Sequence, residues 1–132
     1  MDFRDKDIRR KTLGRKGEDI ACDLLSGMGF EILERNWRSS HKEIDIICRD
    51  GADLRFVEVK SRVAPVSAAP EENVGFRKQQ KLVRAAQLYL HSDTKKEKIS
   101  DLEIDFDIIS VIFEGEKTDI TFFPKAYIPF YL

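Results

Sequence analysis

The sequence predicts an α/β fold in which a mixed β-sheet of about five strands is flanked by helices. Segments 12–28 and 76–91 repeat apolar residues every three or four positions, as amphipathic helices do. Segments 43–49, 54–61 and 104–113 are rich in Ile, Val and Phe, as strands are. The order of helix, strands, helix and strands is typical of a mixed sheet with helical cover.

Length and composition favour one folded domain. The chain has 132 residues, of which 42% are hydrophobic and 36% charged, so a core and a highly charged surface are both expected. We expect a single domain over 1–132, with residues 1–11 frayed and residues 128–132 as a tail.

The charge and cysteine content exclude some classes of protein. The formal net charge is −1, whereas many DNA-binding domains are clearly basic. Cys22 and Cys48 form no disulfide or zinc pattern and are predicted to be reduced, partly buried thiols. The N-terminus is polar, and no segment approaches the roughly 20 apolar residues of a membrane helix, so a soluble, cytoplasmic protein without a membrane partner is expected.

The first helix is expected from about Thr12 to Met28. Its apolar stripe includes Ile20 and Leu24, and Glu18 lies at the edge of that stripe. The preceding residues 2–16 are basic, and we interpret them as the solvated start of this helix rather than as phosphate contacts.

The strands and the second helix follow in order. A short strand is expected over 30–37, then a hairpin whose strands cover 43–49 and 54–61 around the turn signal at 50–53. After a Pro-containing loop, the helix over 76–91 places Lys78 at the edge of its buried face. Later strands are predicted at 104–113, at 120–123 and, more weakly, at 126–127.

The hairpin predicts which side chains meet. If Gly51 and Ala52 form the turn, counting back along both strands places Asp45 opposite Glu58, with Cβ atoms about 4.5–5.5 Å apart. Lys60 shares a face with Glu58 because strand side chains alternate. This register is a hypothesis, since a bulge would shift it.

Two facing carboxylates on apolar strands repel and need a shared proton or a cation. Mg²⁺ is commonly held by one or two carboxylates, water and substrate phosphate, and Lys60 is near enough to contact a phosphate or a water. The group therefore fits metal-assisted phosphodiester hydrolysis. The alternative is a solvated sheet face with an ordinary salt bridge, since a Glu-x-Lys tripeptide alone is common in strands.

An ordered set of motifs runs along residues 14–127: Gly14–Glu18, Glu43–Asp45, Phe56–Arg62, Val74 with the helix around Lys78 and Tyr89, and Phe106–Ile109. This set resembles the YraN-like family of small bacterial proteins, which are similar to archaeal Holliday-junction resolvases of the PD-(D/E)XK nuclease superfamily. The resemblance implies a restriction-endonuclease-like core.

The resemblance also implies roles for individual residues. Asp45 and Glu58 would bind Mg²⁺ or Mn²⁺, together with the backbone carbonyl of Val59. Glu18 would complete the site through a water or a second metal, and Lys60 would orient or activate the attacking water. The residues expected to contact DNA phosphates are Lys78, Arg62 and Arg77, for which a snorkelling lysine and plain surface charge are the competing interpretations.

The chain departs from the family pattern at three places. Lys42 stands where the family usually has glycine, Asp105 where it usually has arginine, and Lys125 with Tyr127 where it has asparagine and phenylalanine. None of these residues is a proposed ligand, so the departures concern substrate contacts and loop geometry.

Three functions remain open from the sequence. The first is a metal-dependent endonuclease acting on DNA, with branched or structured DNA as a candidate substrate and a homodimer as a candidate assembly. The second is a non-catalytic nucleic-acid-binding or accessory protein on the same fold. The third is an assembly partner that uses the aromatic tail around Tyr127 and Phe130, although we expect that tail to pack on the core.

Overall fold

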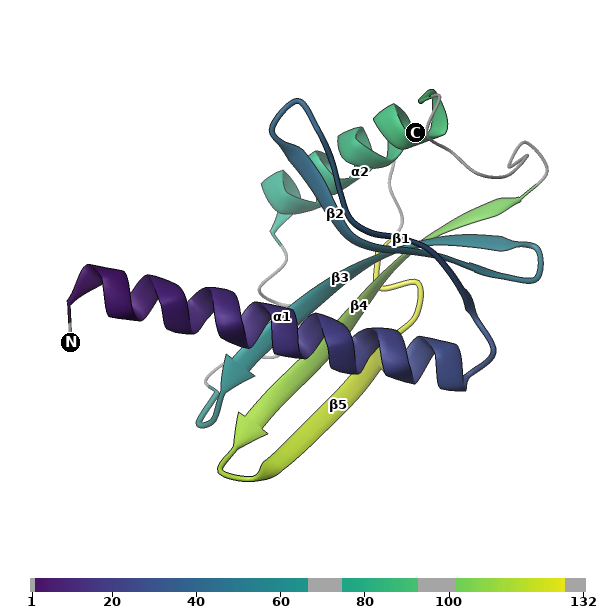
Figure 1. Ribbon diagram of the computed structural model, residues 1–132. Coiled ribbons are helices and arrows are strands. Elements are labelled where there is room, and N and C mark those ends of the chain that lie inside the picture. The colour runs from purple at the N-terminus through teal and green to yellow at the C-terminus, as the bar shows by residue number, and fades with distance from the viewer. Residues whose placement is uncertain (1, 67–74, 93–101, 128–132) are drawn as a thin grey trace.

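A computed structural model describes residues 2–66, 75–92 and 102–127 (Figure 1). It confirms a mixed five-stranded sheet with two helices, consistent with a restriction-endonuclease-like core. The elements are α1 (Phe3–Gly27), β1 (Glu31–Ser39), β2 (Lys42–Asp50), β3 (Asp53–Val63), α2 (Phe76–Leu90), β4 (Glu103–Glu114) and β5 (Lys117–Phe123).

The strands lie in sequence order, β1-β2-β3-β4-β5. All neighbours are antiparallel except β3 and β4, which run parallel. Two parallel strands cannot be joined by a tight turn, and the connection between them contains α2. In Figure 1 this helix lies on the opposite side of the sheet from α1.

Neighbouring residues of β3 contribute to two separate cores because strand side chains alternate between faces. Phe56 packs with Tyr89 and Leu82 of α2. Val57 belongs to the other core, which contains Ala21 and Leu25 of α1 together with residues of β2 and β4. The sheet is therefore covered on both faces, and its middle strands are shielded from water.

Helix α1 begins at Phe3, about nine residues earlier than the apolar pattern predicts. The Asp2 side chain caps the helix by accepting the backbone N–H of Asp5 over 3.0 Å. Lys11 and Asp7 add an ion pair one turn apart. Apolar periodicity reports burial alone, so it missed a helical segment whose exposed turns carry mainly charged residues.

The other boundaries agree with the sequence to within a few residues, except at the C-terminal end. Residues 126–127 form no strand, although the Ala126 N–H donates to the Phe106 carbonyl over 2.8 Å. Tyr127 stacks on the Phe106 ring with centroids 5.5 Å apart, so this part of the aromatic segment packs on the core as expected. Phe130 lies outside the described residues.

Both cysteines are buried free thiols. Neither described helix combines the length and the apolar character needed to cross a bilayer.

Candidate functional site

The β2–β3 hairpin has the predicted turn and register. Asp50 pairs with Asp53 across Gly51 and Ala52, and the pairing continues to Ile46 and Val57. The ladder ends there, so the expected direct pairing of Asp45 with Glu58 does not form. Strand pairing was extrapolated one step too far, because the strands separate at this point.

Asp45 binds the backbone of β3 instead of pairing with it. Its Oδ2 accepts the backbone N–H of Val59 over 2.8 Å. Val59 lies between Glu58 and Lys60 in the sequence, so this hydrogen bond brings Asp45 beside both of them. The loss of one ladder pair is thus compensated by a side-chain hydrogen bond that fixes the carboxylate.

A cleft of about 350 Å³ opens where the two strands separate. It collects four residues that the sequence analysis placed at the site, and five others from the β1–β2 turn, the start of β2 and α2. The lining residues are His41, Lys42, Glu43, Asp45, Glu58, Val59, Lys78, Lys81 and Leu82.

Lys78 forms an ion pair with the acid of β3. Its Nζ lies 2.5 Å from Oε1 of Glu58, whose side chain is only 11% exposed. An ammonium group thus balances one buried carboxylate in the cleft. Lys78 was expected to contact phosphate, and its position at the cleft is compatible with that role.

Burial raises the pKa of Asp45 to about 7. The hydrogen bond from Val59 acts in the opposite direction because it favours the ionised form. The negative charges of Glu18 and Glu58 raise the pKa further. A cation that enters the cleft would therefore stabilise the ionised form of Asp45.

Burial lowers the pKa of Lys60, and the nearby charges of Lys78 and Arg62 lower it further. The negative charge of Glu58 opposes this shift. Lys60 is therefore close to the acid of β3, as alternation predicts, and it holds its proton less tightly than an ordinary lysine.

Close packing of α1 on β3 positions Glu18. A Cβ atom added at Gly17 would lie 1.8 Å from Oγ of Ser61, so only glycine permits the observed approach. Glu18 follows directly, and its charge acts on Asp45 although its side chain does not line the cleft. The site thus uses elements from both faces of the sheet.

The other two residues predicted to bind DNA, Arg62 and Arg77, lie in different positions relative to the cleft. Arg62 acts on Lys60 through its charge. Arg77 is exposed on α2 and does not line the cleft. Sequence reasoning did not assign His41, Glu43 or Lys81 to the site. Lys81 follows Lys78 by three positions on one helix, which is a signal that could have indicated it.

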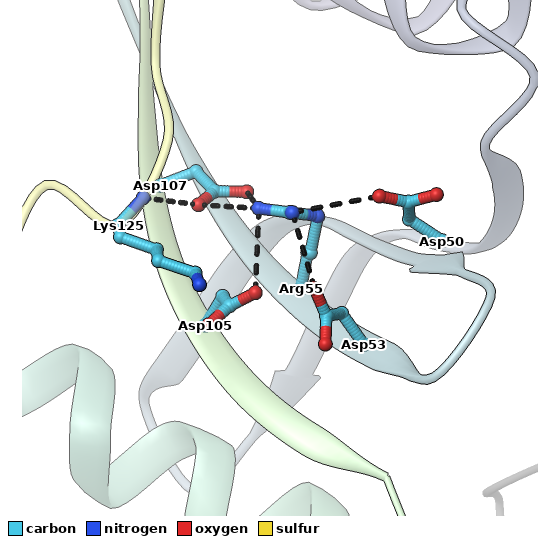
Figure 2. A network of polar contacts seen from close by, with 6 residues as sticks. All are labelled: Asp50, Asp53, Arg55, Asp105, Asp107 and Lys125. Carbon is cyan, nitrogen blue, oxygen red and sulfur yellow. Dashed lines mark hydrogen bonds and ion pairs between the residues drawn. The ribbon is translucent and has the colours of Figure 1, made fainter.

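A buried ion-pair network anchors the same strands at the other end of the hairpin (Figure 2). Arg55 of β3 donates from Nη1 to both carboxylate oxygens of Asp107, which is fully buried, over 3.1 Å each. Asp105 lies 3.5 Å from the same nitrogen, so the residue that departs from the family pattern has an opposite-charge partner. The backbone N–H of Lys125 completes the network by donating to Oδ1 of Asp107 over 2.8 Å.

The donor set suits a hard cation that keeps several waters. Among the described residues, no group of three or more His, Cys, Asp or Glu side chains is gathered as a metal centre. The more buried carboxylates Asp45 and Glu58 share the cleft with Val59, and the more exposed Glu43 also lines it. Mg²⁺ is commonly bound in this way, whereas zinc and calcium sites use more protein ligands.

The comparison with known proteins places the chain in a family. The model of the uncharacterised protein family UPF0102, which corresponds to the YraN-like proteins, matches residues 17–111. The chain belongs to this family. The matched range contains Glu18, Asp45, Glu58 and Lys60.

Several UPF0102 proteins are similar over most of their length. The protein of Dictyoglomus turgidum is 39% identical over 122 residues, which cover 91% of this chain and 100% of that protein. The protein of Desulforamulus reducens is 44% identical over 110 residues, covering 83% and 88%. The protein of Syntrophotalea carbinolica is 40% identical over 119 residues, covering 90% and 94%.

Proposed function

We propose that this protein is a metal-dependent endonuclease that hydrolyses phosphodiester bonds of DNA. The observation that carries the proposal is that Asp45 and Glu58 line one cleft together with Lys78, while Lys60 lies near enough for its pKa to respond to Glu58 and Lys78. A protein that only bound nucleic acid would gain nothing from buried acids at this place, because they repel phosphate.

Asp45, Glu58 and the carbonyl of Val59 would hold Mg²⁺ or Mn²⁺, with Glu18 acting through a water or a second ion. When bound, such an ion lowers the pKa of water and neutralises charge on a phosphate. The Val59 N–H donates to Oδ2 of Asp45 and so fixes the orientation of one carboxylate of this set. The ligand set is therefore held by the backbone of β3.

Lys60 would orient the attacking water and stabilise the negative charge that develops on the phosphate. Burial and two neighbouring cations lower its pKa, so Lys60 gives up a proton more readily than an exposed lysine. Lys78 has a second role. Its ammonium group neutralises Glu58 in the metal-free protein, and it would turn to a DNA phosphate once a cation occupies the cleft.

Arg62 and Arg77 extend the positive charge around the cleft. Arg62 is two residues beyond Lys60 on β3, and Arg77 precedes Lys78 on α2. Both would contact the sugar-phosphate backbone without reading sequence. Branched DNA is one candidate substrate, because a two-fold junction would suit a homodimer.

One observation favours a second candidate function, a DNA-binding protein without catalysis. Three carboxylates line the cleft, but among the described residues no group of three His, Cys, Asp or Glu side chains is gathered so that it could hold a metal ion. In that case Lys78 would keep its ion pair with Glu58 permanently, and no cation would be needed.

A cleavage assay separates the two functions. Native protein, the Asp45→Asn/Glu58→Gln double variant and a Glu103→Gln/Asp119→Asn control, in which both altered acids are exposed, are incubated with linear and four-way branched DNA in Mg²⁺. The nuclease proposal expects cleavage by the native and control proteins alone. DNA binding without cleavage by any of the three would support the second function.

A further inference from the structure

The first turns of α1 extend beyond the sheet (Figure 1). The face of the helix that packs on the sheet carries basic residues in these turns. Leu25, Ala21, Gly17 and Leu13 recur every four residues along this face. Leu25 and Ala21 are buried, Gly17 touches β3, and Leu13 is half-buried. Toward the N-terminus, the apolar stripe that a packed helix would continue is absent.

Cations occupy the next positions on that face. Lys6, Arg9 and Arg10 lie there, and with Lys16 they line a groove of about 580 Å³ between α1 and the end of β3, whose lining also includes Ile8, Thr12 and Leu13. Val63, the last residue of β3, also lines this groove and is 60% exposed. The distance from Gly17 to Lys6 along the helix axis is about 16 Å, or three turns.

Charge is segregated along the chain. Residues 2–16 carry seven Lys or Arg and three Asp, whereas the chain as a whole has a net charge of −1. The rest of the protein is therefore acidic. Of the three Asp, Asp2 caps the helix and Asp7 pairs with Lys11 on another side of α1. Neither of these two acids is paired with a cation of the groove.

The end of β3 lies between the basic groove and the candidate site. Val63 lines the groove, whereas the charge of the preceding residue, Arg62, acts on Lys60 beside the cleft. Consecutive strand side chains point to opposite faces, so the two sets of cations flank the same strand.

We propose that the N-terminal half of α1, residues 3–16, is an arm that binds the phosphate backbone of duplex DNA at the end of β3. The four cations that line the groove there supply the charge that a phosphate backbone requires. This inference rests on the proposed function for its ligand. The family match begins at residue 17, so the arm is assigned from the structure of this chain.

Equilibrium binding to a fluorescent 24-base-pair duplex in EDTA tests the arm without cleavage. Arg9→Gln/Arg10→Gln removes two groove cations, and Gln keeps helix propensity. The matched control, Arg84→Gln/Lys125→Gln, removes two exposed cations that do not line the groove. Far-ultraviolet circular dichroism and thermal unfolding verify that both variants are folded.

The arm variant is expected to weaken binding on the order of tenfold at 0.15 M salt and to reduce the slope of log K against log salt by about two. The control is expected to retain the native slope. Equal slopes for the two variants would overturn the arm, while cleavage by native protein would still support the nuclease.

Two other outcomes also overturn the inference. If native protein binds no duplex, both the arm and the proposed function fail. If the arm variant binds DNA as the control does but loses binding to vesicles that contain phosphatidylglycerol, the basic helix serves a membrane surface instead.

Discussion

The carboxylate of Asp45 accepts the backbone N–H of Val59 over 2.8 Å at the point where β2 and β3 stop pairing. This one bond joins the acid of β2 to the strand that carries Glu58 and Lys60. Hydrogen bonding to the ionised form offsets part of the cost of burying Asp45, but burial prevails and the pKa rises. A cation bound beside Asp45 would therefore stabilise the ionised form of this carboxyl group.

Asp45 should make the stability of the metal-free protein depend on pH. Its pKa is about 7 in the folded protein and about 4 when unfolded, so its stabilising contribution is complete below pH 4 and is lost as the pH rises through 7. Relative to Asp45→Asn, the free energy of unfolding of native protein should fall over this range by at most about 4 kcal/mol. Urea unfolding in EDTA at several pH values measures this difference, and parallel pH profiles would refute it.

Gly17 should be intolerant of a side chain. Gly17→Ala places a Cβ 1.8 Å from Ser61 Oγ and 2.9 Å from its Cβ, so α1 must move away at a cost of about 1–3 kcal/mol. Adding Ser61→Gly should recover most of this loss. Gly14→Ala is the control, because nothing lies within 4 Å of its added Cβ, and it should stabilise α1 slightly. Equal thermal stability of the two alanine variants would contradict this packing.

Arg55 should be essential to stability. Arg55→Met leaves Asp105 and Asp107 buried without their cation, which should cost about 3–5 kcal/mol in chemical unfolding. Arg84→Met, on the exposed face of α2, should change stability by less than about 0.5 kcal/mol. An Arg55→Met protein as stable as the Arg84→Met protein would show that the network in Figure 2 contributes little.

Lys78 should weaken the binding of Mn²⁺ and strengthen the binding of DNA. Lys78→Met removes the ammonium group that competes with a metal for Glu58, so Mn²⁺ should bind a few-fold more tightly. The same change should weaken DNA binding, because it removes a cation from the cleft. Calorimetry and DNA titration measure the two effects, with Arg84→Met as the control. Weaker binding of Mn²⁺ by the variant would count against a metal site at Glu58.

The sequence predicted the parts of the fold that depend on burial and local turns. Apolar periodicity located α2, and the turn at Gly51 and Ala52 gave the hairpin register as far as Ile46. Charged residues 3–11 gave no such signal, although a capped helix forms there. Burial patterns cannot report a helix that is not buried.

The candidate site was only partly predictable for a related reason. Asp45, Glu58 and Lys60 lie on one hairpin, so counting along two strands brought them close together. The separation of the strands at Asp45 and the approach of Lys81 depend on tertiary packing. The partnership of Arg55 with Asp107 joins residues 52 positions apart, and alternation along one strand cannot reveal it.

Calorimetric titration with Mn²⁺ tests the central claim most directly. Native protein, Asp45→Asn/Glu58→Gln and the exposed-acid control Glu103→Gln/Asp119→Asn are compared at pH 8, where Asp45 is ionised. The account predicts one saturable site in the native and control proteins and none in the double variant. Absence of binding by native protein, or equal binding by all three, would contradict a metal site in the cleft.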